Sequence, residues 1–191
     1  MITSTTVRRA ALIAALLSVP GLHAAEVAGV KVDEKIRVGS SDLVLNGAGL
    51  RSKLFIKVYV GALYVGQKAT TPAAIVDSTQ PRRMVMRMMR DLDADSLNSA
   101  LDDGLKSNHT PAELAEMKPQ SDALAAIMKA IGKAREGDTI TIDFSVDGVA
   151  VGLNGETRGK VAGVGFAKAL LKVWLGEKPV DASLKKALLG S

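Results

Sequence analysis

The chain contains no cysteine and only two histidines among its 191 residues. Without cysteine it can form no disulfide, no redox-active thiol and no thiolate metal site, so the folded domain must be stable through packing alone. His23 lies in the N-terminal segment, and only His109 follows it. The sequence therefore gives no support for a histidine-based metal centre. We expect neither a metal nor a cofactor.

Aromatic residues are also scarce, at 3%, and the net charge is mildly positive, at +5. Because no basic helix or aromatic stacking platform stands out, nucleic acid is a poor candidate partner. Hydrophobic residues make up 47% of the chain and charged residues 24%. This balance argues against disorder and favours one globular domain with a real core.

The first 24 residues have the layout of a secretory signal peptide. Two arginines precede the apolar run from Ala10 to Val19, and the small residues Ala24 and Ala25 follow it. The run is too short to span a bilayer as a helix, and no later run is long enough to be a membrane span. We predict cleavage after Ala24 or Ala25, a single domain over residues 25–191, and a periplasmic or secreted location.

Strand patterns dominate the first half of the chain and recur in one late hairpin. In the stretch from Leu54 to Val65 both alternating faces are largely apolar, which predicts a central strand covered on both sides. A Gly-Ala-Gly turn is expected just before Arg51. Further strands are predicted at 26–32, 35–45, 82–92, 139–146 and 149–153. In the last pair, Asp147-Gly148 favours a type I′ turn, with Ile140, Ile142, Phe144 and Val146 facing inward.

Helical periodicity and capping signals appear between and after these strands. Asp93 or Asp95 can cap a helix over 93–107, and the segment from Thr110 to Glu113 reads as a capping box. Further helices are predicted at 73–76, 121–134, 160–176 and 181–190, with Pro119 interrupting the one that starts at Thr110. Strands followed by helices, a hairpin and more helices indicate an α+β domain: one antiparallel sheet with a layer of helices on one face.

Familiar catalytic motifs are missing from the sequence. There is no nucleophile elbow, phosphate loop or metal-ligand cluster, and the segment from Gly152 to Gly159 reads only as a glycine-rich turn. Asp102 and Asp103 are adjacent on a helix, so they point in different directions and cannot pair as acid and base. We interpret His109, just before a helix cap, as a solvated loop residue.

Arg51 is the residue that the pattern leaves unexplained. An arginine beside apolar strands needs water or an anion, and its guanidinium is shaped to hold a carboxylate through two hydrogen bonds. Tyr59 could add a hydroxyl donor. On one continuous strand the two would lie about 26 Å apart, so they cooperate only if the chain reverses, for which residues 51–53 are the candidate. An arginine at the surface of a hairpin remains the alternative.

Several segments resemble the chalcone isomerase fold family. They are GAGLR at 47–51, KLFIKVYVGALYV at 53–65, LDDGLKSN at 101–108 and FAKALLKVWLGEKPVDASLKKALLG at 166–190. Together they span most of residues 28–190. The chain is therefore identified as an exported bacterial member of the chalcone isomerase-like group. This resemblance implies a curled antiparallel sheet, an open-faced β-sandwich with helices on one side, and an apolar cleft between sheet and helices.

The resemblance also implies two functions for such a cleft. Plant enzymes of this fold cyclise a chalcone without a cofactor, and Arg51 matches the arginine that stabilises the developing charge. A non-catalytic branch binds fatty acids, with an arginine and a tyrosine on the carboxylate, and Tyr59 matches that tyrosine where the isomerases have a threonine. Isomerase site positions on the helices fall near Asp93, Ser96, Ala100 and Val173, none of which keeps the catalytic residue type.

We therefore expect a non-catalytic binding protein for a small apolar carboxylate such as a fatty acid. Arg51 would pair with the head group and Tyr59 would donate a hydrogen bond. The candidates for the apolar wall are Phe55, Met84, Met86, Met88 and Trp174, although we expect some of the methionines to be core, and Trp174 at a helix end fits a packing anchor better than a cleft wall. The alternatives are a cofactor-free intramolecular lyase acting on an enone or phenolic compound, with Arg51 as stabiliser, and an interaction module whose cleft is filled.

Overall fold

The structure is a computed structural model that describes residues 24–190. The predicted signal peptide lies outside the described residues except for Ala24, so that assignment stays a prediction. Within the described range no helix has both the length and the apolar character needed to cross a membrane.

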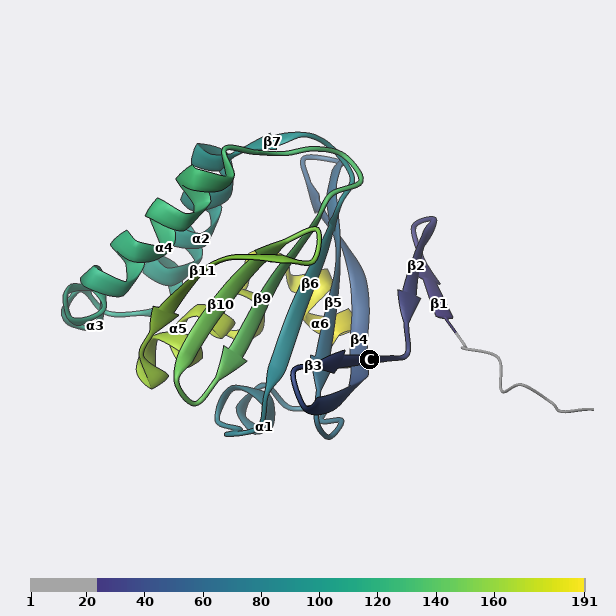
Figure 1. The fold of residues 1–191 in the computed structure, drawn as a ribbon, viewed down its shortest axis with the longest axis horizontal. Coiled ribbons are helices and arrows are strands. Elements are labelled where there is room, and N and C mark those ends of the chain that lie inside the picture. Colours follow the sequence, from purple (N-terminus) through teal and green to yellow (C-terminus); the bar gives the residue numbers. More distant parts are fainter. Residues whose placement is uncertain (1–23, 191) are drawn as a thin grey trace, which may run out of the picture.

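A seven-stranded antiparallel sheet forms the centre of the molecule and curls around the helices (Figure 1). Its spatial order is β11-β10-β9-β6-β5-β4-β3, and every neighbouring pair is antiparallel. The strands are β3 (Lys35–Val38), β4 (Ser41–Lys53), β5 (Ile56–Val65), β6 (Arg82–Met88), β9 (Thr139–Ser145), β10 (Gly148–Leu153) and β11 (Glu156–Ala162). The short strands β7 (Leu92–Asp93) and β8 (Lys133–Ala134) pair separately.

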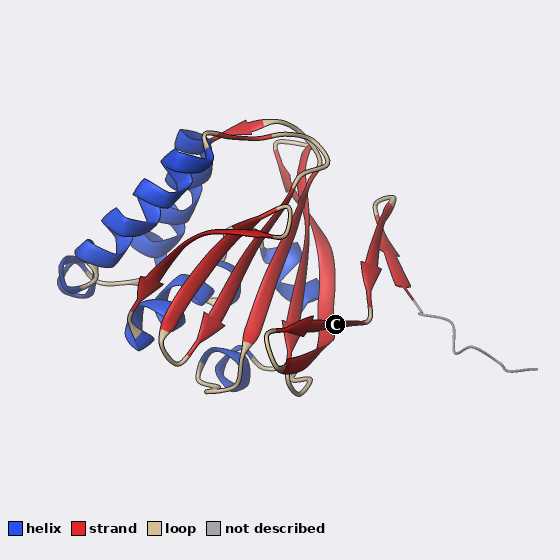
Figure 2. Ribbon diagram, in the orientation of Figure 1, coloured by secondary structure: helices blue, strands red, loops and turns tan. Residues whose placement is uncertain are grey.

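The helices lie on one face of this sheet, as predicted (Figure 2). They are α1 (Pro72–Val76), α2 (Ala94–Asn108), α3 (Pro111–Glu116), α4 (Lys118–Ile131), α5 (Val164–Leu175) and α6 (Ala182–Leu188). The main core between helices and sheet includes Leu63, Met84, Ile142, Leu170 and Trp174. The predicted α+β class with a helical layer on one face is confirmed.

The helix boundaries follow local capping chemistry that the sequence predicts. Asp93 caps α2 by accepting a hydrogen bond from the Ser96 amide at 2.7 Å. Thr110 and Glu113 form the expected capping box. Pro119 then stands in the first turn of the separate helix α4, where a missing N–H costs little.

The opposite face of the sheet carries a second, smaller core beneath an N-terminal hairpin. Strands β1 (Ala24–Val27) and β2 (Val30–Asp33) form this hairpin, where the sequence pattern predicts one strand. Val32 packs with Leu43, Val60, Ala62 and Tyr64. Strand β5 is thus buried on both faces from Val58 to Val65, which confirms the prediction for that stretch.

The predicted Gly-Ala-Gly turn before Arg51 is wrong, because these residues lie inside the continuous strand β4. A Cβ on Gly47 would lie 2.0 Å from the Ala187 carbonyl oxygen, and one on Gly49 would lie 2.6 Å from Ala187 Cβ. These glycines do not reverse the chain direction. They allow helix α6 to pack directly on the backbone of strand β4. Beside them, buried Asn46 donates to the Leu188 carbonyl at 2.7 Å and holds the helix end in place.

The late hairpin is confirmed, but its turn lies at Val146-Asp147 instead of Asp147-Gly148. Ser145 pairs with Gly148, and Val146 is 49% exposed in the turn rather than facing inward. The glycine-rich segment after it holds a further hairpin with Asn154 and Gly155 at its tip, both at positive φ. Residues 160–162, expected to be helical, therefore belong to β11.

Candidate functional site

The β4–β5 hairpin brings Arg51 directly opposite Tyr59. The reversal required for this pairing occurs at Leu54-Phe55, directly after the 51–53 candidate, and Lys53 pairs with Ile56 across it. The guanidinium carbon of Arg51 lies 5.5 Å from the centroid of the Tyr59 ring. The predicted cooperation of these two residues thus has a geometric basis in the hairpin.

A β-bulge next to this pair adjusts where the side chains point. Arg51 pairs with Tyr59 but Ser52 pairs with Lys57, so Val58 is the extra residue on β5. Val58 and Tyr59 both join the core on the helical side, although they are adjacent in sequence. A bulge re-aims a side chain in this way, and simple alternation along the sequence does not foresee it.

Tyr59 forms the centre of a hydrogen-bonded unit with a helix. The indole Nε1 of Trp174 on α5 donates to the Tyr59 hydroxyl at 2.8 Å, and both side chains are buried. Burial raises the pKa of Tyr59 to about 12, although Arg51 and the Trp174 hydrogen bond oppose that rise. The phenol therefore stays protonated at neutral pH. Within residues 24–190 its proton has no acceptor, which leaves it available to a ligand.

Arg51 is half-buried and has no counter-ion among the described residues. Its Nε is fully buried and makes no hydrogen bond. A buried guanidinium N–H without a partner is costly, because the group has lost water and gained nothing in return. Such an orphaned donor is the arrangement expected where an anionic group completes the site.

A small apolar cavity adjoins Arg51 and Tyr59 between the sheet and helices α2, α4 and α5. Its volume is about 30 Å³, room for about one water molecule. Arg51, Tyr59 and Ala100 line part of this cavity. The rest of its wall is made by larger apolar side chains: Met86, Leu97, Leu101, Met128, Ile140, Val173, Trp174 and Val180.

A wider groove of about 550 Å³ opens on the other side of Arg51. The end of β4, one side of α2 and the segment from Lys178 to Val180 line it, including Ser96, Ser99 and Asp103. Arg51, Ala100 and Val180 belong to both spaces. Arg51 thus stands at the boundary between a polar groove and an apolar interior.

The structure distributes the predicted wall residues over three different places. Met86 and Trp174 line the cavity beside Arg51 and Tyr59. Met84 and Met88 share the Met86 face of β6 but are buried in the general core, at 0% and 2% exposure. Phe55 does not belong to the wall at all: it lies in the hairpin turn and is fully exposed, because the reversal falls on it.

Most of the cavity wall is not predicted by the sequence. Leu97 and Leu101 are buried residues of α2 and Met128 of α4, and helical periodicity predicts such burial but does not indicate a cavity. Ala100 and Val173 were singled out by position, since they fall where isomerases have polar residues. Their small or apolar side chains fit the lining that the structure shows.

His109 differs from the interpretation as a solvated loop residue. Its side chain is only 3% exposed, and its Nε2 lies 3.3 Å from the Ala169 carbonyl oxygen. It helps to anchor the end of α2 to α5 and does not line the cavity. Across residues 24–190, no group of three or more histidine, cysteine, aspartate or glutamate side chains is placed to hold a metal ion.

A curled antiparallel sheet, one helical layer and an arginine at an apolar cavity define an open-faced β-sandwich of the chalcone isomerase type. The family model for chalcone isomerase-like proteins matches residues 24–190, so the chain belongs to the chalcone isomerase-like family. A search of curated proteins found no match. Among solved structures, a fatty-acid binding protein of Arabidopsis thaliana is similar, with a TM-score of 0.66 and 16% identity over 84% of this chain and 92% of that one.

Proposed function

We propose that this protein binds a fatty acid or a similar small apolar carboxylate between its sheet and its helices. The observation that carries the proposal is the buried, unpartnered Nε of Arg51 at the edge of an apolar cavity. A carboxylate placed there would accept from Arg51 and from the Tyr59 hydroxyl, whose proton has no acceptor among the described residues. Family membership and the similarity to a fatty-acid binding protein support the same ligand class.

The acyl chain would enter the apolar side of Arg51, because the groove on the other side is lined mainly by polar and charged residues, namely serines, two aspartates and two lysines. A cavity of about 30 Å³ must open to accept it. Two of its walls are Met86 and Met128, whose flexible thioether side chains rearrange at little cost. Ligand binding would thus enlarge a space that is nearly closed without it.

The signal-like N-terminal segment supports a further part of the proposal, that the mature protein works after export, in the periplasm or outside the cell. Fatty acids with long acyl chains are poorly soluble in water and aggregate at low concentration. A binding protein in that compartment would keep it monomeric.

The lyase alternative has less support from the geometry. Among residues 24–190, Arg51 and Tyr59 are the only ionisable residues that line the cavity, and with its raised pKa Tyr59 is a neutral phenol at pH 7. Neither can accept a proton from a substrate under these conditions. An intramolecular cyclisation would have to start from a substrate that is already ionised.

Trp174 provides the test, because it is the only tryptophan in the chain and donates to Tyr59. We expect palmitate or laurate to change Trp174 fluorescence saturably, and methyl palmitate, which lacks the carboxylate, to bind more weakly. Arg51→Ala should weaken fatty-acid affinity by about tenfold to a hundredfold, the range for hydrogen bonds to a charged group.

Arg37→Ala is the matched control, since Arg37 is an exposed arginine paired with Asp42 on the surface. It should bind as the wild type does. The proposal fails if fatty acids leave the fluorescence unchanged, or if Arg51→Ala and Arg37→Ala bind equally well.

A further inference from the structure

The turn of the β4–β5 hairpin combines two features that are unfavourable for a soluble domain. Leu54 and Phe55 form the turn, with φ of 50° and 67°, a backbone region in which non-glycine residues are strained. Asparagine and glycine are the usual residues for such a turn, and the same chain uses Asn154 and Gly155 in its β10–β11 hairpin. The backbone conformation of the turn therefore does not explain why Leu54 and Phe55 occupy it.

The same residues are exposed to water. Leu54 is 83% exposed, Phe55 102% and Ile56 50%, so three large apolar side chains cluster at one tip. None of the three belongs to either hydrophobic core of the described residues 24–190. Where a chain keeps both backbone strain and apolar exposure at one place, the compensating contact is with something outside the molecule.

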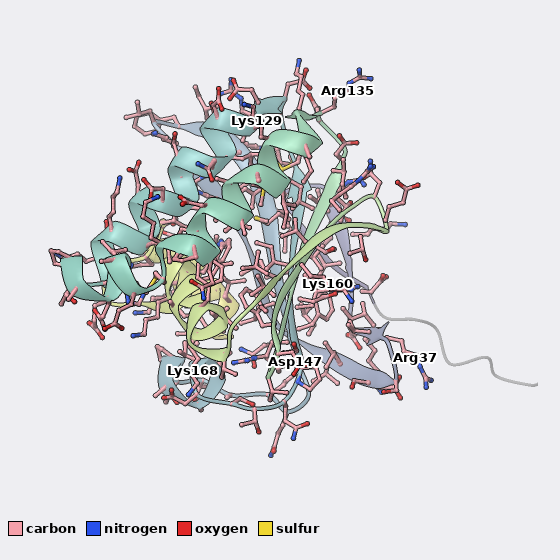
Figure 3. All side chains as sticks on the ribbon, turned by 60° about the vertical axis from the view of Figure 1, so that its left-hand side comes forward. Arg37, Lys129, Arg135, Asp147, Lys160 and Lys168 are labelled. Atoms are coloured by element: carbon pink, nitrogen blue, oxygen red, sulfur yellow. The ribbon has the colours of Figure 1, made fainter. Side chains whose placement is uncertain are left out.

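Cationic residues flank the apolar tip. Lys53 and Lys57 stand on the two strands beside the turn, both exposed and without an ion pair to any residue that the structure describes. No acidic residue occurs from Arg51 to Lys57. Figure 1 shows this tip at the same end of the sheet as β7, and Figure 3 shows Lys129 and Arg135 at that end.

We infer that the tip formed by Lys53 to Lys57 is a membrane-docking element that inserts Leu54, Phe55 and Ile56 into an anionic lipid surface. Apolar side chains enter the boundary between headgroups and acyl chains while flanking lysines contact the anionic headgroups. An anionic lipid surface suits both parts of the tip, because it offers an apolar layer beneath negative charge. A protein partner would need an acidic rim around an apolar pocket.

The position of the tip relates it to the candidate site. Arg51, Ser52 and Lys53 line the polar groove beside Arg51, so the tip and the groove share one strand end. Docking would hold the groove close to the lipid surface. The inference stands apart from fatty-acid binding, because it concerns a surface whose apolar residues do not line the cavity.

Vesicle co-sedimentation tests the inference with the mature chain. We expect the protein to pellet with vesicles of equal parts phosphatidylglycerol and phosphatidylcholine and to bind less to phosphatidylcholine alone. The double substitution Leu54→Asn with Phe55→Gly should abolish pelleting, and Lys57→Glu should weaken it by at least about fivefold, the loss of one lysine at an anionic surface. The absence of cysteine also allows a dye on Phe55→Cys to report insertion by a blue shift.

The matched controls are Val146→Asn, which changes an exposed valine in the turn beside Asp147 at the other end of the sheet, and Lys160→Glu on β11. Both should pellet like the wild type. The inference is overturned if the tip variant still pellets, if the controls lose binding equally, or if sedimentation equilibrium shows a dimer that the tip variant abolishes while vesicles bind neither form. Trp174 titration without vesicles tests fatty-acid binding separately, so the two proposals can fail independently.

Discussion

Arg51 and Tyr59 face each other across the β4–β5 ladder, and the guanidinium carbon lies 5.5 Å from the centroid of the tyrosine ring. At this distance the cation is attracted to the face of the ring. Because Trp174 donates to the hydroxyl of the same tyrosine, strands β4 and β5 and helix α5 are joined at one point. A ligand that moves Arg51 or Tyr59 must therefore also change the surroundings of Trp174.

Replacing Tyr59 by phenylalanine distinguishes the contribution of its hydroxyl group from that of its ring. The ring contact with Arg51 remains, but the buried indole N–H of Trp174 loses its acceptor. We expect Tyr59→Phe to lower the free energy of unfolding by about 1–3 kcal/mol, the cost of an unsatisfied buried donor, in urea denaturation. Tyr64→Phe is the control, because its hydroxyl donates to the carbonyl of the exposed residue Asp33, and should cost less. Equal losses would contradict this role of Tyr59.

Alkaline pH should destabilise the fold through both tyrosines. Burial raises the pKa of Tyr59 and of Tyr64 from 10.0 to about 12. The unfolded chain therefore releases these protons first, so stability is fully present below pH 10 and is lost as the pH rises to about 12. For fully buried Tyr59 the shift corresponds to roughly 2–3 kcal/mol.

Tyrosinate absorbance and urea unfolding, followed together from neutral to alkaline pH, measure this effect. Titration of both tyrosines near pH 10 in the folded protein would contradict it. Tyr59→Phe should make the loss of stability with pH less steep.

Gly104 on α2 sets how closely this helix approaches α5. A Cβ at this position would lie 2.6 Å from Val173 Cγ1, so Gly104→Ala must push the helices apart. We expect a loss of about 1–3 kcal/mol in the free energy of unfolding, typical of overpacking. Combined with Val173→Ala, the total loss should be smaller than the sum of the two single losses, whereas Gly165→Ala, with open space at its Cβ, should not destabilise. Losses that add up fully in the double variant would contradict the contact.

The strained tip should make the protein less stable than it could be. Leu54→Asn with Phe55→Gly supplies the residues that the turn geometry favours. We expect thermal and urea unfolding to show a gain of about 1–3 kcal/mol, since each non-glycine residue at positive φ costs about 1–2 kcal/mol. A loss of stability would mean that the apolar side chains pack within the protein. A gain in stability together with a loss of vesicle binding would show that Leu54 and Phe55 serve membrane binding at a cost in stability.

Local chemistry determined most of the elements that the sequence could predict. Asp93 and the Thr110 capping box set helix boundaries through hydrogen bonds between near neighbours, and Pro119 does so because it lacks a backbone N–H. The apolar stretch of β5 and the alternating methionines of β6 follow from side-chain periodicity. The family resemblance was carried by short contiguous motifs, and the match over residues 24–190 confirms it. Arg51 could be singled out because a charge in an apolar pattern is visible without coordinates.

Contacts between distant segments decided the rest. The glycines of β4 looked like a turn because nothing near them in sequence reveals that α6 packs against them. The bulge at Val58 and the turn at Leu54-Phe55 depend on which residues pair across strands, and they moved Tyr59 into the core and Phe55 into water. The three methionines of β6 also differ in their surroundings, since of these three only Met86 lines the cavity. A sequence specifies residue types and local preferences, but tertiary packing determines which of several suitable side chains meet at one site.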